Sequence, residues 1–85
     1  MSVLSQVLFK LEKLVPVDKV NILTTIKRFR TKLAYTAPEL HGALWHDVFE
    51  EIIIELIAPH DSEPWTEPIH QLWQDNVPLQ KTRQP

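Results

Sequence analysis

Four histidines are the side chains of this sequence best suited to acid–base chemistry near neutral pH or to metal binding, namely His41, His46, His60 and His70. Their spacing favours neither use. His46 and Glu50 lie one helical turn apart and could share a metal, but no His-Glu-x-x-His motif accompanies them. We therefore expect ordinary surface or helix-rim histidines, with no metal site and no bound cofactor.

Other catalytic signatures do not occur either. No serine or threonine stands in a nucleophile-elbow motif, and a chain with a single glycine has no glycine-rich loop to cradle a phosphate. We predict no catalytic residues and no small-molecule substrate, so the expected protein is not an enzyme.

Charge is segregated along the chain. Residues 1–32 carry seven basic and two acidic side chains, whereas residues 33–80 carry nine acidic side chains and no lysine or arginine. Such asymmetry is typical of helices that pack with complementary charged rims, within one chain or between two chains. It also allows two faces of opposite potential on one molecule.

The basic residues suggest one of two binding hypotheses. A helix face that carries phosphate-binding cations is possible, with the candidate residues Lys19, Lys27, Arg28, Arg30 and Lys32. However, a helix-turn-helix would put residues 37–49 into the major groove, and that segment is acidic. The net charge of −2 and the pI near 6 weaken this alternative further.

Large apolar side chains support the hypothesis that we prefer, which is binding to another protein. Aromatic residues are the usual anchors of interfaces, and this small chain has more large apolar groups than a three-helix core easily hides: Phe9, Trp45, Ile54, Trp65 and Trp73. An acidic docking face would comprise Asp47, Glu50 and Glu51. Alternatively, the tryptophans pack the proline-rich C-terminal part back onto the helices.

Two helices are predicted in the first 35 residues. Apolar residues recur at spacings of three and four over residues 2–14, which is the helical period, and Phe9 points away from that stripe beside Lys10 and Lys13. Pro16 ends this helix. Asp18 is expected to cap the second helix, residues 19–35, whose apolar face comprises Ile22, Leu23, Ile26, Phe29 and Leu33.

The longest apolar stretch predicts a third helix over residues 37–58. Thr36 and Glu39 form a capping-box pattern at its start, Pro38 is tolerated in the first turn, and Pro59 acts as a stop. At about 100° per residue, one face is expected to comprise Trp45, Val48, Phe49, Ile52, Ile53 and Leu56. Ile54 projects among the acidic residues on the other side.

A short fourth helix is predicted over residues 67–75. Thr66 is its expected cap, and Ile69, Leu72 and Trp73 share a face. The predicted fold is therefore all-α: a small three-helix domain with a short fourth helix, spanning residues 1–75, and a frayed, flexible tail over residues 76–85.

Length and composition limit the remaining possibilities. An 85-residue chain buries a modest core, and without cysteine it has no disulfide to stabilise it. We therefore expect a homodimer. No stretch approaches the roughly 20 apolar residues of a membrane span, and we expect a cytoplasmic protein. The predicted function is that of a small, non-enzymatic regulatory or adaptor protein, such as an inhibitor with an acidic docking face, that acts by protein–protein interaction.

Overall fold

The computed structural model describes residues 2–77, and within them it contains helices and no strand. Their order is α1 (Val3–Leu14), α2 (Val20–Ala34), η1 (Pro38–Leu44), α3 (Trp45–Val48), η2 (Phe49–Ile57), η3 (Ala58–His60) and α4 (Thr66–Asn76). The predicted all-α class is confirmed. The predicted tail, residues 76–85, lies outside the described residues from residue 78 onward, while Asn76 still belongs to α4.

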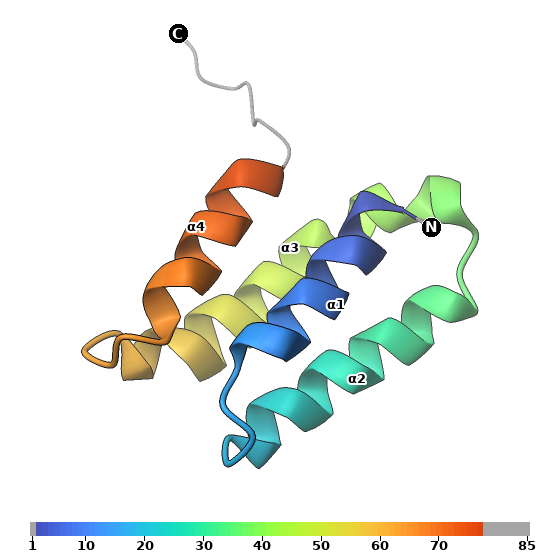
Figure 1. The fold of residues 1–85 in the computed structure, drawn as a ribbon. Coiled ribbons are helices and arrows are strands. Elements are labelled where there is room, and N and C mark those ends of the chain that lie inside the picture. Colours follow the sequence, from blue (N-terminus) through green and yellow to red (C-terminus); the bar gives the residue numbers. More distant parts are fainter. Residues whose placement is uncertain (1, 78–85) are drawn as a thin grey trace, which may run out of the picture.

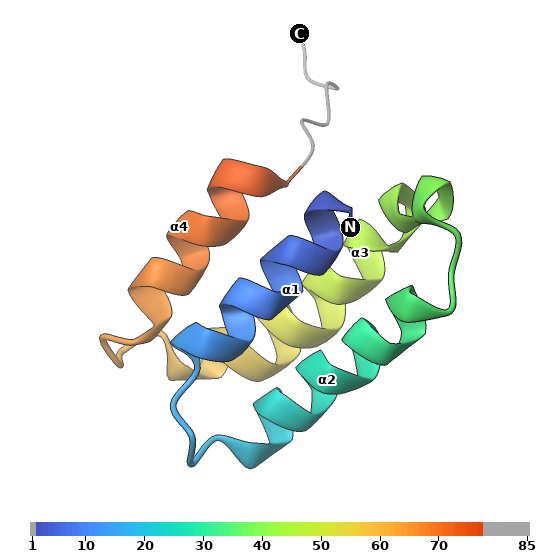
Figure 2. The ribbon, with the colours of Figure 1, turned by 45° about the vertical axis from the view of Figure 1, so that its right-hand side comes forward.

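Helix α1 is central to the arrangement. It lies between α2 and α4, with the α3–η2 stretch behind it in both views (Figures 1 and 2). The inner side of α1 is buried, and its buried residues are Leu4, Val7, Leu8 and Leu11. Ser2 caps α1 by accepting the Ser5 backbone N–H at 3.2 Å. The predicted helix over residues 2–14 is confirmed.

Helix α2 is also confirmed, but its predicted cap is wrong. Lys19 occupies the capping position without a side-chain hydrogen bond, and Asp18 is not used. The physical reason is the turn before the helix, in which the Lys19 N–H donates to the Pro16 carbonyl at 3.0 Å. That turn leaves Asp18 outside the position from which its carboxylate would reach the first free N–H groups.

The capping box predicted at Thr36 does not form. Thr36 belongs to the end of α2, because its N–H donates to Leu33 at 3.1 Å and its hydroxyl donates to Lys32 at 2.8 Å. Ala37 then precedes a 3₁₀ segment, η1, and no side chain caps it. The single helix predicted for residues 37–58 is instead a 3₁₀ segment, a short α-helix and a π-helix, and helical turns continue past Pro59 to His60.

The π-helical geometry of η2 changes which residues reach the core. A helix with i→i+5 bonds has about 4.4 residues per turn, or roughly 80° per residue. At that angle Val48, Ile52, Ile53 and Ile57 share one side, and all four are buried. Leu56, expected on the inner face at the α-helical angle, is only half-buried, and Ile57 takes its place.

Helix α4 covers α1 and the α3–η2 stretch with Ile69 and Trp73, which both join the buried core. It begins one residue earlier than predicted, and Trp65, rather than Thr66, occupies the capping position. Thr66 is buried and donates its hydroxyl to the Glu63 carbonyl at 2.9 Å. Across residues 2–77, no helix combines the length and apolar character that crossing a membrane requires.

Candidate functional site

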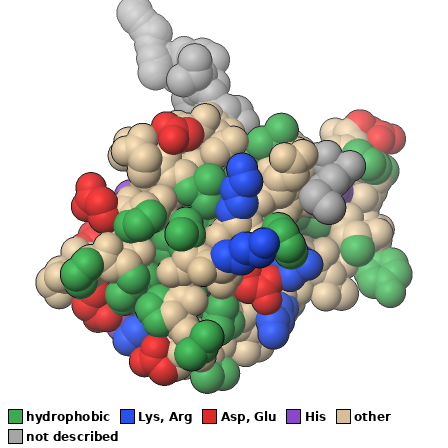
Figure 3. Space-filling view, viewed as in Figure 1, with side chains coloured by type: hydrophobic (Ala, Val, Ile, Leu, Met, Phe, Trp, Pro, Cys, Tyr) green, Lys and Arg blue, Asp and Glu red, His purple; other side chains and the backbone are tan. Residues whose placement is uncertain are grey.

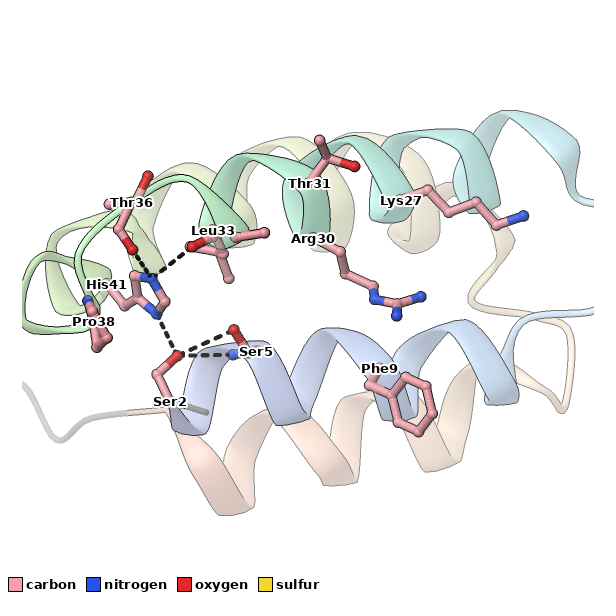
Figure 4. A pocket seen from close by; sticks show the side chains of 11 residues that line it. Ser2, Ser5, Phe9, Lys27, Arg30, Thr31, Leu33, Thr36, Pro38 and His41 are labelled. Carbon is pink, nitrogen blue, oxygen red and sulfur yellow. Dashed lines mark hydrogen bonds between the residues drawn. The ribbon is translucent and has the colours of Figure 1, made fainter.

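A groove between α1 and α2, which ends at η1, hollows the surface of the described residues (Figure 4). Its volume is about 710 Å³. Phe9 lines it from α1 and Lys27, Arg30 and Thr31 line it from α2, with His41 at its end. Figure 4 shows Arg30 pointing from α2 toward α1. We call this hollow the α1–α2 groove. It has an apolar lining with cations along its rim.

Phe9 is the exposed aromatic of this groove, with 41% of its surface accessible. The Lys13 ammonium lies 4.4 Å from its ring centroid, and the Arg30 guanidinium carbon lies 5.1 Å from it. Cations at these distances are attracted to an aromatic face. The ring is therefore held in place by charged groups, and apolar neighbours do not cover it, as the outward orientation predicted for Phe9 requires.

The rim of the α1–α2 groove is positive on balance. Arg30 bonds one oxygen of Glu12, and the Lys27 ammonium lies 3.8 Å from the other oxygen. Two cations therefore share one carboxylate, and Lys13, over the Phe9 ring, adds a third cation beside them. Figure 3 shows Lys and Arg side chains gathered beside hydrophobic ones in the middle of the face that carries α1 and α2.

His41 closes the η1 end of the groove and corrects the expectation of surface or rim histidines, because it is only 5% exposed. Its Nε2 lies 3.1 Å from the Leu33 carbonyl oxygen and 3.0 Å from that of Thr36. Since carbonyls only accept, Nε2 carries a proton and donates to both. The other ring nitrogen, Nδ1, bonds the Ser2 hydroxyl.

This hydroxyl–imidazole contact connects segments that are far apart in the sequence. A serine bonded to a histidine is a pairing used in nucleophilic catalysis, but the Ser2 oxygen already accepts the Ser5 N–H as the cap of α1. His41 therefore ties the start of α1 to the end of α2 and to η1. It gives the groove a fixed end wall.

The predicted acidic face lies on α3 and η2, on the opposite side of α2 from the groove. Asp47 and Glu50 are exposed, and Glu51 bonds Arg28. With Lys32 and Glu55 they line a shallow hollow of about 280 Å³. Ile54 is 45% exposed, as its predicted position among acidic residues implies.

The three tryptophans predicted as binding residues occupy different environments. Trp73 is buried, with its ring centroid 5.3 Å from that of Trp45 and 5.6 Å from that of Phe49. We call these three residues the aromatic cluster. Trp65 is half-buried and lies in the connection before α4, 5.5 Å from the His60 ring. The tryptophans therefore do not form one continuous surface.

Glu63 organises the connection between η3 and α4. It accepts the Trp65 indole N–H at 2.7 Å and bonds His60 Nδ1 at 2.8 Å, while the Lys19 ammonium lies 3.6 Å away. These contacts favour the charged carboxylate, and the indole N–H contributes most. They lower the pKa of Glu63 from 4.5 to about 2.

The candidate nucleic-acid residues are largely committed to carboxylates of the same chain. Lys19 pairs with Glu63 and Arg28 with Glu51, while Lys27 and Arg30 share Glu12. Lys32 is exposed. The segregated charges of the sequence therefore meet within one molecule, as complementary helix rims do.

The sequence analysis did not identify Glu12 as a partner of the groove cations, and it placed His41 at the surface. Glu12 carries a signal, because it is the single acid of a basic helix and follows Phe9 by one turn. His41 carries none, since its partners Ser2, Leu33 and Thr36 come from separate segments. Among residues 2–77, no three His, Asp or Glu side chains gather as metal ligands would.

Comparisons with protein-family models, with curated proteins and with solved structures each found no match to this chain. The arguments for its function therefore rest on the geometry and charge of the surfaces described above.

Proposed function

We propose that this chain is a small, non-enzymatic adaptor or regulatory protein that binds another protein through the α1–α2 groove. The observation that carries the proposal is Phe9, a large aromatic side chain that is 41% exposed and lines the α1–α2 groove. Exposed aromatics that line a depression are the usual anchors of protein interfaces. Trp45 and Trp73 serve the proposal less well, because they pack against each other.

The shape and charge of the groove favour a particular class of partner. Two neighbouring helices with an apolar floor between them suit a third, amphipathic helix laid into the groove. The rim has three cations, Lys13, Lys27 and Arg30, and one carboxylate, Glu12. An acidic flank on the incoming helix complements this excess, and charge complementarity speeds encounter and fixes register.

Nucleic-acid binding through α2 is the competing proposal, and the ion pairs argue against it. Phosphates would have to displace Glu12, Glu51 and Glu63 from the lysines and arginines that they contact. Titration with a short mixed-sequence duplex at low salt tests it. Binding that weakens steeply with salt and on Lys27→Ala would favour nucleic acid as the ligand over a protein.

Site-specific photo-crosslinking in cells that make the protein tests the main proposal. A photoreactive phenylalanine replaces Phe9, and the control carries it at Gln74, which is exposed on α4. We expect a protein adduct from position 9 alone. The purified adduct partner should bind the wild type, and Phe9→Ala should weaken that binding at least about tenfold. Equal adducts from both positions, or none from position 9, would refute the groove as the binding site.

A further inference from the structure

The same molecule carries a second surface that complements the α1–α2 groove. We define the acidic ridge as the exposed residues Asp47, Glu50, Ile54 and Glu55 of α3 and η2. Ile54 is 45% exposed, and the π-helical angle places it away from the buried side of η2. The ridge therefore offers an exposed aliphatic side chain beside carboxylates.

The two surfaces have opposite charge excesses of the same size. At the rim of the groove, Lys27 and Arg30 contact the one carboxylate, Glu12, and Lys13 adds a third cation over the Phe9 ring. Around the ridge, once the Arg28–Glu51 pair is set aside, the three carboxylates of the ridge meet one cation, Lys32. An apolar floor with a positive rim thus complements an exposed aliphatic side chain beside carboxylates, the combination that a helix-in-groove contact uses.

A single copy does not bring these surfaces together. Helix α2 stands between them, with Lys27 and Arg30 on its groove side and Arg28, bonded to Glu51, on its ridge side. The pairing therefore requires a second molecule. It also leaves one groove and one ridge free after every contact.

We propose that the protein associates with itself head to tail, with the acidic ridge of one copy seated in the α1–α2 groove of the next. This inference rests on the proposed function, because it uses the same groove and names a second copy of the chain as its partner. A head-to-tail contact is heterologous, so it closes into a ring or continues as a chain. The predicted homodimer is the first step of that series.

Salt dependence follows from the chemistry of the contact. The Debye length is about 10 Å at 0.1 M salt and about 3 Å at 1 M, so the exposed charges of both surfaces are largely screened at high salt. Light scattering coupled to size exclusion should show a mass that rises with protein concentration at low salt and falls toward the monomer at about 1 M salt.

Two blocked variants provide the decisive test. Phe9→Glu spoils the groove and keeps the ridge, whereas Ile54→Lys spoils the ridge and keeps the groove; both positions are exposed. Each variant alone should be monomeric. Their mixture should form a one-to-one dimer that grows no further, because one intact groove meets one intact ridge. Gln74→Lys, at an exposed position of α4, is the control and should assemble like the wild type.

The outcomes separate this inference from the proposed function. A wild type that stays monomeric up to about 1 mM refutes self-association, while an adduct to a different protein from position 9 still supports the groove as a binding site. Self-association that survives both blocked variants refutes the head-to-tail contact. Circular dichroism of each variant must match the wild type, and replacing Phe9→Glu by Phe9→Ala supplies a milder block if it does not.

Discussion

The aromatic cluster buries its central ring, whereas the α1–α2 groove leaves an aromatic ring exposed. In the cluster, Trp73 is 5% exposed and meets two other aromatic rings. In the groove, Phe9 is 41% exposed and its close partners are the cations Lys13 and Arg30. The Trp73 ring fills the contact between α4 and the α3–η2 stretch, whereas the Phe9 ring stays accessible in the groove between α1 and α2.

The difference shows that the neighbours of an aromatic residue, and not its type, decide whether it stabilises the core or stays accessible for binding. Burial of a large ring against other rings stabilises the fold. A ring held by cations keeps an accessible face, and only the charged heads around it lose freedom. Substitutions in the two regions should therefore separate stability from binding.

The largest expected effect is at Trp73. Trp73→Ala removes the ring that Trp45 and Phe49 pack against, and a buried Trp→Ala change costs about 3–5 kcal/mol. Urea denaturation followed by circular dichroism measures the loss, and Gln74→Ala on the exposed side of α4 is the control. A loss below about 1 kcal/mol would contradict the conclusion that the aromatic cluster stabilises the core, and the cluster would then be free for binding.

The next effect concerns the end wall of the groove. His41→Leu keeps a similar volume but leaves the carbonyls of Leu33 and Thr36 without the imidazole N–H, at a cost of about 1–3 kcal/mol. Equilibrium unfolding should show this loss for His41→Leu and less than about 0.5 kcal/mol for His46→Leu, which is exposed. Equal losses would mean that the buried hydrogen bonds contribute nothing measurable.

Phe9→Ala should have a small effect on stability, about 1 kcal/mol or less, because exposed cation–π contacts contribute about 0.5–1 kcal/mol each. Thermal and urea unfolding measure it. If this variant unfolds nearly like the wild type yet no longer binds the partner protein, Phe9 acts in binding and not in folding. If Phe9→Ala destabilises as much as Trp73→Ala, the Phe9 ring belongs to the core.

The smallest effect depends on pH and lies beside Trp65. The pKa of Glu63 is lowered from 4.5 to about 2, so its stabilising contribution is complete above pH 4.5 and is lost as the pH falls toward 2. The melting temperature of the wild type should therefore approach that of Glu63→Gln over this range. A difference between the two proteins that stays constant from pH 5 to pH 2 would show that the indole and imidazole contacts do not hold the charged carboxylate.

The helical fold was predictable where one period governs a long segment. In α1 and α2, the 3.6-residue repeat places Leu8 and Ile26 inside and Phe9 outside, and the structure agrees. Capping was less predictable. Thr36 and Asp18 have the right chemistry for caps, but the Thr36 hydroxyl bonds the Lys32 carbonyl, and a turn from Pro16 to Lys19 makes Lys19 the capping residue of α2.

The groove itself was predictable only in part. Phe9 and its outward direction follow from the period of α1, and the cations of α2 were already candidates for binding. The pairing of Arg30 with Glu12 depends on how α1 and α2 lie side by side, and the burial of His41 depends on three segments meeting. Local sequence contains no record of such contacts.

The π-helical stretch η2 has a consequence for how the length of this chain can vary. Two turns at about 4.4 residues per turn need about nine residues, whereas two α-helical turns need about seven. Phe49–Ile57 is nine residues long. In a form of the protein shortened by Ile54 and Glu55, the same two turns could wind as an α-helix, and at about 100° per residue Ile52 and Ile57 would keep their inward direction. The shortened form would lose Ile54 and Glu55 from the acidic ridge, so the proposed head-to-tail contact should weaken in it.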